Sequence, residues 1–273
     1  MELSLFDTHT HYNHASYAPF QDRVLMGIRE GGIGDVLVAG YDLISSLAAC
    51  MMKEQFEGRG DAFPRIHAAV GIHPEYLPKD SEKDLAALRA MIEKYHPAAI
   101  GEMGLHFPRG KQLTEDVRAR QMELFLRQLS LCEEYDLPAV LHFVGAAAKG
   151  YGIIERRPRI RGILHGFTGS AETAVCYGKA GWLIGIGPGI LRENVKKLKE
   201  VCRRLPAEYL VAETDCPFGC SGIPGVVEGL PDSLQLKAVM EKIAELKEES
   251  FEEVQRTLGE NARRMLIHGY REE

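Results

Sequence analysis

Residues 3–11 read Leu-Ser-Leu-Phe-Asp-Thr-His-Thr-His, an apolar start that becomes polar within one strand length. A strand directs successive side chains to opposite faces, so Asp7, His9 and His11 are expected on the same face. Two imidazoles spaced in this way can reach one metal ion while the backbone stays extended. Asp7, one step deeper, is expected to hold a ring N–H of a neighbouring histidine. A His-x-His pair alone is a weak signal, so its meaning depends on the rest of the chain.

The same pattern recurs further along, where an ionisable residue ends an apolar run in each of four more segments. In a parallel barrel the carboxyl ends of all strands meet at one face, where catalytic groups lie. A buried charge there is costly unless it is paired or bound to a metal. We therefore expect a divalent-metal site built from six side chains: His9, His11, Glu102, His142, His165 and Asp215.

Short apolar runs alternate with longer amphipathic segments along the whole chain. The candidate strands are 3–9, 35–39, 66–72, 98–103, 139–143, 160–165, 182–186 and 209–213. Segment 115–135 has apolar residues at helical spacing, and helices at 232–247 and 251–268 are expected to close the chain. Eight strand–helix alternations indicate parallel β-α-β units. They predict an α/β fold, a (β/α)₈ TIM barrel with residues 1–273 as a single domain, in preference to an open doubly wound sheet.

Composition narrows the class of protein. The chain has 273 residues, of which 45% are hydrophobic and 26% charged, enough for a large buried core. The net charge of -6 gives no broad basic surface, so nucleic-acid binding would need a local patch. The start has neither a basic leader nor an apolar signal core, and no apolar run reaches the roughly 18 to 20 residues of a membrane span. With no disulfide framework among the cysteines, a cytoplasmic protein without membrane contact is expected, and no obligate protein partner is evident.

Four imidazoles and two carboxylates suffice for two divalent ions about 3.5 to 4 Å apart, bridged by a carboxylate and a water. Shared coordination would lower the pKa of that water from about 15.7 toward 7 and give hydroxide at neutral pH. Glu102 is the expected bridge, and Asp215 is the expected ligand or proton acceptor for the attacking water. These two are the candidate catalytic residues. Histidine-rich ligation permits Zn, Mn, Ni or Co, and the carboxylates leave Mg open.

Several motifs follow one another in order over nearly the whole chain. They are F-D-T-H-T-H at 6–11, V-G-I-H-P at 70–74, A-I-G-E-M-G-L at 99–105, R-x-x-Q-x-x-x-F-x-x-Q-L at 118–129, L-P-A-V-L-H at 137–142, L-H-G-F-T-G-S at 164–170, V-A-E-T-D-C-P at 211–217 and G-E-N-A-R-R-M-L at 259–266. Together they resemble the TatD family of metal-dependent hydrolases, within the amidohydrolase-like barrels. The resemblance implies a (β/α)₈ barrel, metal-assisted phosphodiester hydrolysis, chiefly of DNA ends, and the six residues above as ligands of two metals.

Three positions depart from that family pattern. His106 stands where the family usually has Asp, Val144 where it usually has Arg, and Glu-Gly-Leu-Pro at 228–231 where it has a loop containing Asn. All three fall near the substrate side, whereas the ligand positions are intact. The missing arginine removes a bidentate phosphate contact. The intact ligand positions therefore predict metal-dependent chemistry, whereas the three departures leave the substrate open.

The leading hypothesis is a TatD-type phosphodiesterase or deoxyribonuclease, acting on DNA or another phosphodiester through a metal-bound hydroxide. The alternatives are a hydrolase of a small amide, lactone or phosphoester, and a metal-binding protein without turnover. Candidate substrate contacts are His73, His106, Arg109 and Lys111.

Three further interpretations concern residues near these motifs. Glu213 is expected to be a buried carboxylate bonded to a neighbouring histidine or to backbone. Cys216 and Cys220 invite a soft-metal interpretation, which the complete set of hard ligands disfavours. The arginines at 156, 157, 159 and 161 precede the sixth strand, so they should lie at the bottom of the barrel, opposite the metals.

Overall fold

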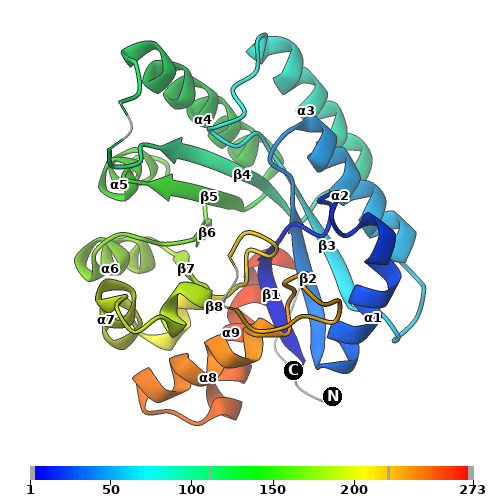
Figure 1. Cartoon of the computed structure of the whole chain (residues 1–273). Coiled ribbons are helices and arrows are strands. Elements are labelled where there is room, and N and C mark those ends of the chain that lie inside the picture. The colour runs from blue at the N-terminus through cyan, green and yellow to red at the C-terminus, as the bar shows by residue number, and fades with distance from the viewer. Residues whose placement is uncertain (1–3, 111, 220–221, 270–273) are drawn as a thin grey trace.

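The computed structural model describes residues 4–110, 112–219 and 222–269. Eight strands form one sheet in which each strand pairs in parallel with the next in chain order. The strands are β1 (Leu5–Thr10), β2 (Ile33–Ala39), β3 (Arg65–Val70), β4 (Ala99–His106), β5 (Ala139–Val144), β6 (Gly162–His165), β7 (Trp182–Ile186) and β8 (Leu210–Ala212). The sheet curls into a nearly closed barrel, which confirms the predicted (β/α)₈ architecture (Figure 1).

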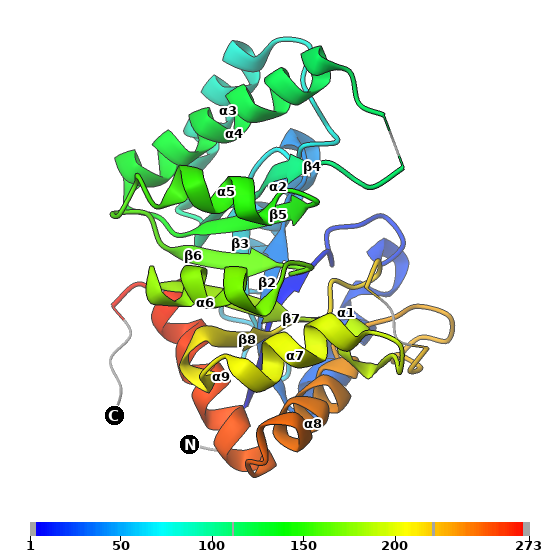
Figure 2. The same cartoon turned by 90° about the vertical axis from the view of Figure 1, so that its left-hand side faces the viewer.

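Helices surround the strands on the outside, as the two views in Figures 1 and 2 show. They are α1 (Gln21–Glu30), α2 (Leu43–Phe56), α3 (Ser81–Tyr95), α4 (Glu115–Tyr135), α5 (Ala147–Ile154), α6 (Ala171–Lys179), α7 (Lys196–Arg204), α8 (Gln235–Lys247) and α9 (Phe251–Leu266), with short 3-10 turns η1 (Ala18–Phe20), η2 (Pro188–Leu191) and η3 (Ala207–Tyr209). Helix α4 has the predicted bounds, because Thr114 caps its first turn through the backbone N–H of Val117. None of the helices in the described ranges is both long and apolar enough to cross a membrane.

The interior of the barrel is filled by one apolar side chain from each strand. These residues form one buried cluster: Phe6, Leu37, Ala69, Ala99, Val140, Ile163, Leu183 and Val211. Ala262 and Leu266 of α9 pack against this cluster near the start of β1, where Arg263 donates to the Ser4 carbonyl at 2.8 Å. The amino-terminal end of the barrel is therefore packed, which leaves the carboxyl ends of the strands for a functional site.

The seam between β8 and β1 is closed largely by the residues that follow β8. The Thr8 hydroxyl donates to the Ala212 carbonyl at 3.1 Å, and two backbone hydrogen bonds of 2.8 Å join Asp215 to His9 and His11 to Cys216. This backbone pairing carries the segment after β8 along the carboxyl end of β1. It places Asp215 beside the two histidines.

Strand β4 extends to His106, three residues beyond the predicted end, and contains a bulge. Ile100 pairs with Ala139 and Met103 with Leu141, so three residues of β4 span two of β5. The extra residue falls at Gly101–Glu102, where Gly101 has φ 153° and a Cβ would lie 2.4 Å from the Val140 carbonyl oxygen. A bulge re-aims the side chain that follows it. Glu102 therefore lies within β4 and not at its end.

Candidate metal centre

Four donor atoms, from β1, from within β4 and from the segments that follow β1 and β8, form a compact group. His9 Nε2 lies 3.2 Å from His11 Nε2 and 3.5 Å from Glu102 Oε2. Asp215 Oδ1 lies 3.8 Å from His9 Nε2 and 3.3 Å from His11 Nε2, and Glu102 Oε2 lies 3.7 Å from His11 Nε2. A tetrahedral ion with bonds of about 2.0 to 2.2 Å has donor–donor edges of about 3.3 to 3.6 Å. The observed spacing fits such an ion.

The other carboxylate oxygen of Glu102 faces a different pair of histidines. Glu102 Oε1 lies 2.7 Å from His142 Nδ1 on β5 and 3.7 Å from His165 Nε2 on β6. His165 Nε2 is also 3.9 Å from Asp215 Oδ2. The two oxygens of this buried carboxylate thus face two pairs of histidines, and the rings of His9 and His165, one from each pair, stack on one another. All six residues singled out in the sequence come together here, and their role as ligands stays a prediction.

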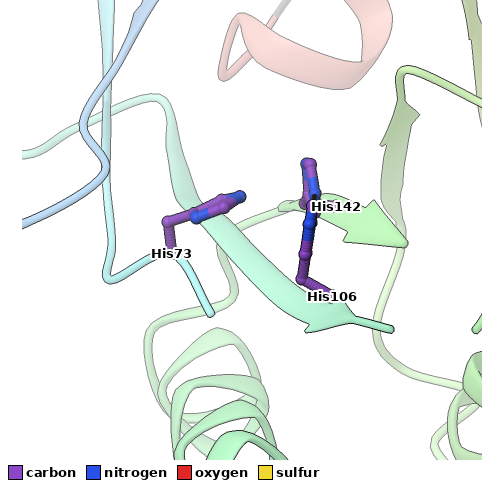
Figure 3. A group of neighbouring side chains, drawn as sticks. All are labelled: His73, His106 and His142. Carbon is purple, nitrogen blue, oxygen red and sulfur yellow. Dashed lines mark hydrogen bonds between the residues drawn. The ribbon is translucent and has the colours of Figure 1, made fainter. Parts of the chain in front are cut away.

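Two more histidines lie beside this cluster (Figure 3). His106, the last residue of β4, places Nδ1 2.9 Å from His142 Nε2. His73, in the loop after β3, is 7% exposed and places Nε2 3.7 Å from Glu102 Oε1. Both were expected as substrate contacts, and both contact candidate ligands. Their contact with substrate stays a prediction.

The charges of the cluster are those of a cation site. Burial alone would raise the pKa of Glu102, but His142 and His9 hold that pKa well below its usual range. Burial also opposes protonation of His165, yet Glu213 and Asp215 raise its pKa to about 10. Burial lowers the pKa of His73 to about 3. In the described part of the chain, the ion-pair partners of Glu102 and Asp215 are histidines, so carboxylate charge gathers without lysine or arginine to balance it.

Contacts behind the cluster orient two of its rings. Glu213, 1% exposed, places Oε1 3.1 Å from His165 Nδ1 and accepts a 2.7 Å hydrogen bond from the Gly166 N–H. Its predicted role as a buried carboxylate bonded to a neighbouring histidine or to backbone is confirmed by the hydrogen bond from Gly166. Gly185 makes room for it, because a Cβ there would lie 2.3 Å from Glu213 Oε2. His11 Nδ1 lies 3.0 Å from the Ala39 carbonyl, which leaves Nε2 directed at the cluster.

The predicted contact between Asp7 and an imidazole was wrong. Asp7 accepts hydrogen bonds from the Thr214 N–H at 3.0 Å and from the Thr214 and Ser233 hydroxyls, each at 2.6 Å. Phe6 points into the barrel, so Asp7 points out of it, toward the seam with β8. A register shift between Asp7 and Thr10 then returns His9 to the interior. The simple alternation assumed for residues 7 to 11 is broken at that shift.

The remaining predicted residues lie further from the cluster or outside the described ranges. Arg109 is exposed in the loop after β4, and its contact with substrate stays a prediction. Lys111 and Cys220 fall outside the described residues. Cys216 is buried, which raises the pKa of its thiol to about 12, and none of the possible metal-holding groups found among the described residues includes it.

Sequence reasoning missed an aromatic arc, which we define as Tyr41, Tyr76 and Phe218. The ring of Phe218 lies 5.2 Å from that of His11, which is 5.7 Å from Tyr41, and Tyr41 is 4.9 Å from Tyr76. Tyr76 is 50% exposed and Phe218 57%. Their positions carried a usable signal, because each follows a candidate site residue, His73 or Asp215, by three positions.

A cavity of about 360 Å³ opens beside His165 and Asp215. It is lined by the loops after β6 and β7 and by the first turn of α7, through Gly166, Phe167, Thr168, Gly169, Gly187, Pro188, Gly189 and Lys197 among others. It gives a substrate direct access to Asp215, whose side chain is 27% exposed. Lys197 is the cationic side chain among these lining residues.

A parallel barrel with histidines and carboxylates gathered at the carboxyl ends of its strands is the architecture of a metal-dependent enzyme. A family model described as TatD related DNase matches residues 6–267, and the chain belongs to this family. It is 34% identical to the uncharacterized metal-dependent hydrolase YabD of Bacillus subtilis, over 96% of this chain and 98% of that one. It is 27% identical to the 3'-5' ssDNA/RNA exonuclease TatD of Pantoea vagans, over 95% of this chain and 98% of that one. The crystal structure of YjjV, a TatD homologue from Escherichia coli, matches with a TM-score of 0.84 and 27% identity, covering 97% of this chain and 99% of that chain.

Proposed function

We propose that this chain is a divalent-metal-dependent phosphodiesterase that shortens single-stranded nucleic acid, with DNA as its first substrate. The observation that carries the proposal is the placement of Glu102, whose two oxygens face His9 and His11 on one side and His142 and His165 on the other. A relative of this chain is named a 3'-5' ssDNA/RNA exonuclease, and that activity agrees with the proposal.

Two divalent ions fit the donor set. His9, His11 and Asp215 would hold one, His142 and His165 the other, and Glu102 would bridge them. When bound, such ions polarise a phosphoryl oxygen and lower the pKa of water. The four imidazoles suit Zn, Mn, Ni or Co, and the carboxylates keep Mg among the candidates.

The carboxylates of Glu102 and Asp215 are suited to different roles because their exposure to solvent differs. The Glu102 side chain is 6% exposed and closed off by histidines, whereas that of Asp215 is 27% exposed and lines the cavity. Burial alone would raise the pKa of Asp215, but His165 and His11 lower it, so the carboxylate is ionised at neutral pH. Asp215 is therefore the group that accepts a proton from an attacking water. Lys197 in the cavity supplies positive charge for a phosphate.

The aromatic arc favours a substrate with unpaired bases. Exposed rings beside a phosphate site stack bases of any sequence, as in proteins that bind single strands. Phe218 offers such a ring beside His11, and Tyr76 offers another beyond Tyr41. A small amide or lactone would leave both rings exposed to water.

The test is metal-dependent trimming of an end-labelled single-stranded DNA oligomer. Metal-free protein is reloaded with Mn²⁺, Mg²⁺, Zn²⁺, Co²⁺ or Ni²⁺ in turn, and products are resolved by length. We expect trimming by the native chain and a loss of at least about 100-fold in Glu102→Gln and Asp215→Asn. Absence of trimming with all five metals would rule out the nuclease.

A hydrolase of small substrates is the second candidate. It is favoured by Val144, which offers no phosphate contact, and by the size of the cavity, about 360 Å³. A panel of lactones, amides and phosphomonoesters separates the two, because a small-substrate hydrolase would turn over one of them and leave DNA intact. A metal-binding protein without turnover would be inert toward both panels.

A further inference from the structure

His142 is held through both of its ring nitrogens. Nδ1 lies 2.7 Å from Glu102 Oε1, and Nε2 lies 2.9 Å from His106 Nδ1. The rings of His106 and His142 are 18° from coplanar with centroids 5.2 Å apart, so they meet edge to edge (Figure 3). This is the geometry of an in-plane hydrogen bond between two imidazoles.

His106 is itself fixed in place. Its backbone N–H donates at 2.9 Å to Oε1 of Gln121, a buried residue of α4. Its ring Nε2 lies 3.6 Å from Glu75 Oε1. Pairing of Gly104 with His142 and of His106 with Val144 sets the last residues of β4 against β5. The ring of His106 therefore lies between His142 on one side and the carboxylate of Glu75 on the other.

The direction of these contacts follows from the chemistry of imidazole. A neutral imidazole that offers one nitrogen to a metal carries its proton on the other. If Nδ1 of His142 faces the ion bridged by Glu102, its proton is on Nε2 and needs an acceptor. His106 Nδ1 is that acceptor, so the proton of His106 is on Nε2, where it faces Glu75.

We propose that His106 and Glu75 form a positioning pair that fixes the tautomer and ring orientation of His142. The inference rests on the proposed metal site. It assigns His106 and Glu75 to the support of the ion that His142 and His165 would hold. Partners that hold the distal N–H of a ligating histidine change metal affinity by about 10- to 100-fold. The pair acts through His142, so its effect should be confined to the ion that His142 holds.

The competing arrangement is an ion held by His73, His106 and His142 themselves, whose donor atoms lie within 4.8 Å of one another. Such an ion would require His142 to bind metals through both nitrogens and to lose both ring protons. The 2.9 Å separation of His106 Nδ1 and His142 Nε2 is a hydrogen-bond length. The hydrogen-bonded pair needs no such deprotonation. A count of bound ions distinguishes the two arrangements.

The experiment is calorimetric titration of the metal-free full chain with Mn²⁺, together with the visible spectrum of the Co²⁺-loaded protein. The variants are His106→Leu, His106→Asn, which keeps an acceptor near the position of Nδ1, and Glu75→Gln. His268→Leu, an exposed histidine outside the cluster, is the matched control. Circular dichroism of each metal-free variant checks its fold.

We expect the native chain to bind two ions. His106→Leu should weaken the second about 10- to 100-fold and alter the Co²⁺ bands of that ion alone, with the first unchanged. Recovery of native affinity in His106→Asn and a smaller loss in Glu75→Gln would support the positioning pair. Native affinity in His106→Leu would overturn it, as would three ions in the native chain and two in His106→Leu. A native chain that binds no ion would overturn the metal proposal itself.

Discussion

At the scale of single residues, the roles proposed for Glu102 and Asp215 follow from the different exposure of their side chains. Glu102 is enclosed by five histidines, whereas Asp215 reaches the cavity. An enclosed carboxylate can hold ions but cannot exchange protons readily with solvent. Asp215, which follows a strand of only three residues, combines contact with His11 and access to water. The division between holding ions and moving protons therefore follows from burial.

The aromatic arc gives a prediction about substrate affinity. Replacing Tyr76 or Phe218 with Ala should raise KM for a single-stranded oligonucleotide about 5- to 100-fold, because a stacked base contributes about 1 to 3 kcal/mol. The value of kcat should stay within about 2-fold, since neither ring reaches the reacting atoms. Steady-state kinetics on a fluorescent oligomer measures both constants.

Two controls accompany that measurement. Met51→Ala removes an exposed apolar side chain of α2 and should leave KM unchanged. A small phosphodiester without bases should be cleaved equally well by all variants. An equal loss on both substrates would show that the rings support the site and do not bind bases.

At the scale of secondary-structure elements, hydrophobic periodicity located all eight strands and their order, because strands buried on both faces read as short apolar runs. It could not locate the irregularities. The shift after Asp7 and the bulge at Gly101–Glu102 each add a residue to one strand of a pair, and alternation assumes that none is added. Four site residues were found because each ends an apolar run, and His9 and His11 were found from their spacing at the end of the first strand. The contacts of Asp7 and His106 were missed because they depend on register.

Asp35 of β2 yields a prediction about how the elements are joined at the other end of the barrel. Its buried carboxylate accepts two 2.8 Å hydrogen bonds from Arg65 on β3 and lies 2.9 Å from His67 and 3.5 Å from Arg263 of α9. Asp35→Asn should lower the free energy of unfolding by about 3 kcal/mol at pH 7, because Arg263, whose side chain is only 11% exposed, loses its carboxylate partner. Denaturant titration measures this free energy. As a control, Asp136→Asn removes the charge of an exposed pair with Arg161 and should change the free energy of unfolding by less than about 0.5 kcal/mol.

The effect of Asp35 should depend on pH in a defined direction. Burial alone would raise its pKa, but His67 and Arg65 lower it below the usual value. A carboxyl with a lowered folded-state pKa stabilises the fold above its unfolded pKa of about 3.9 and loses that contribution as pH falls through the folded value. The difference between the native chain and Asp35→Asn should be constant from about pH 5 to 8 and shrink below about pH 4. A difference that grows on acidification would contradict this account.

At the scale of the whole molecule, closure of the barrel depends on Asp7. Its carboxylate joins β1 to Thr214 after β8 and to Ser233 before α8. Asp7→Asn places an amide donor among four groups that donate to this side chain, so we expect a loss of about 2 to 4 kcal/mol in unfolding free energy from groups left unsatisfied. Thermal unfolding of the metal-free protein measures it. Asp22→Asn, whose Arg59 partner is exposed, should be close to neutral. A neutral Asp7→Asn would show that backbone pairing alone closes the seam.

Metal binding should stabilise the entire barrel, because the candidate ligands come from four strands (β1, β4, β5 and β6) and from the segments that follow β1 and β8. They meet as a set only in the folded chain, so ions bind the native state far better than the unfolded one. At 100 times the dissociation constant, binding one ion adds about 2.7 kcal/mol, which for a chain of this size raises Tm by about 5 to 10 °C. We expect that shift when Mn²⁺ is added to metal-free protein and its reversal by chelator. Glu102→Gln should show a much smaller shift, since it removes the carboxylate shared by both groups of histidines. An equal shift in Glu102→Gln would place the stabilising ion elsewhere on the molecule.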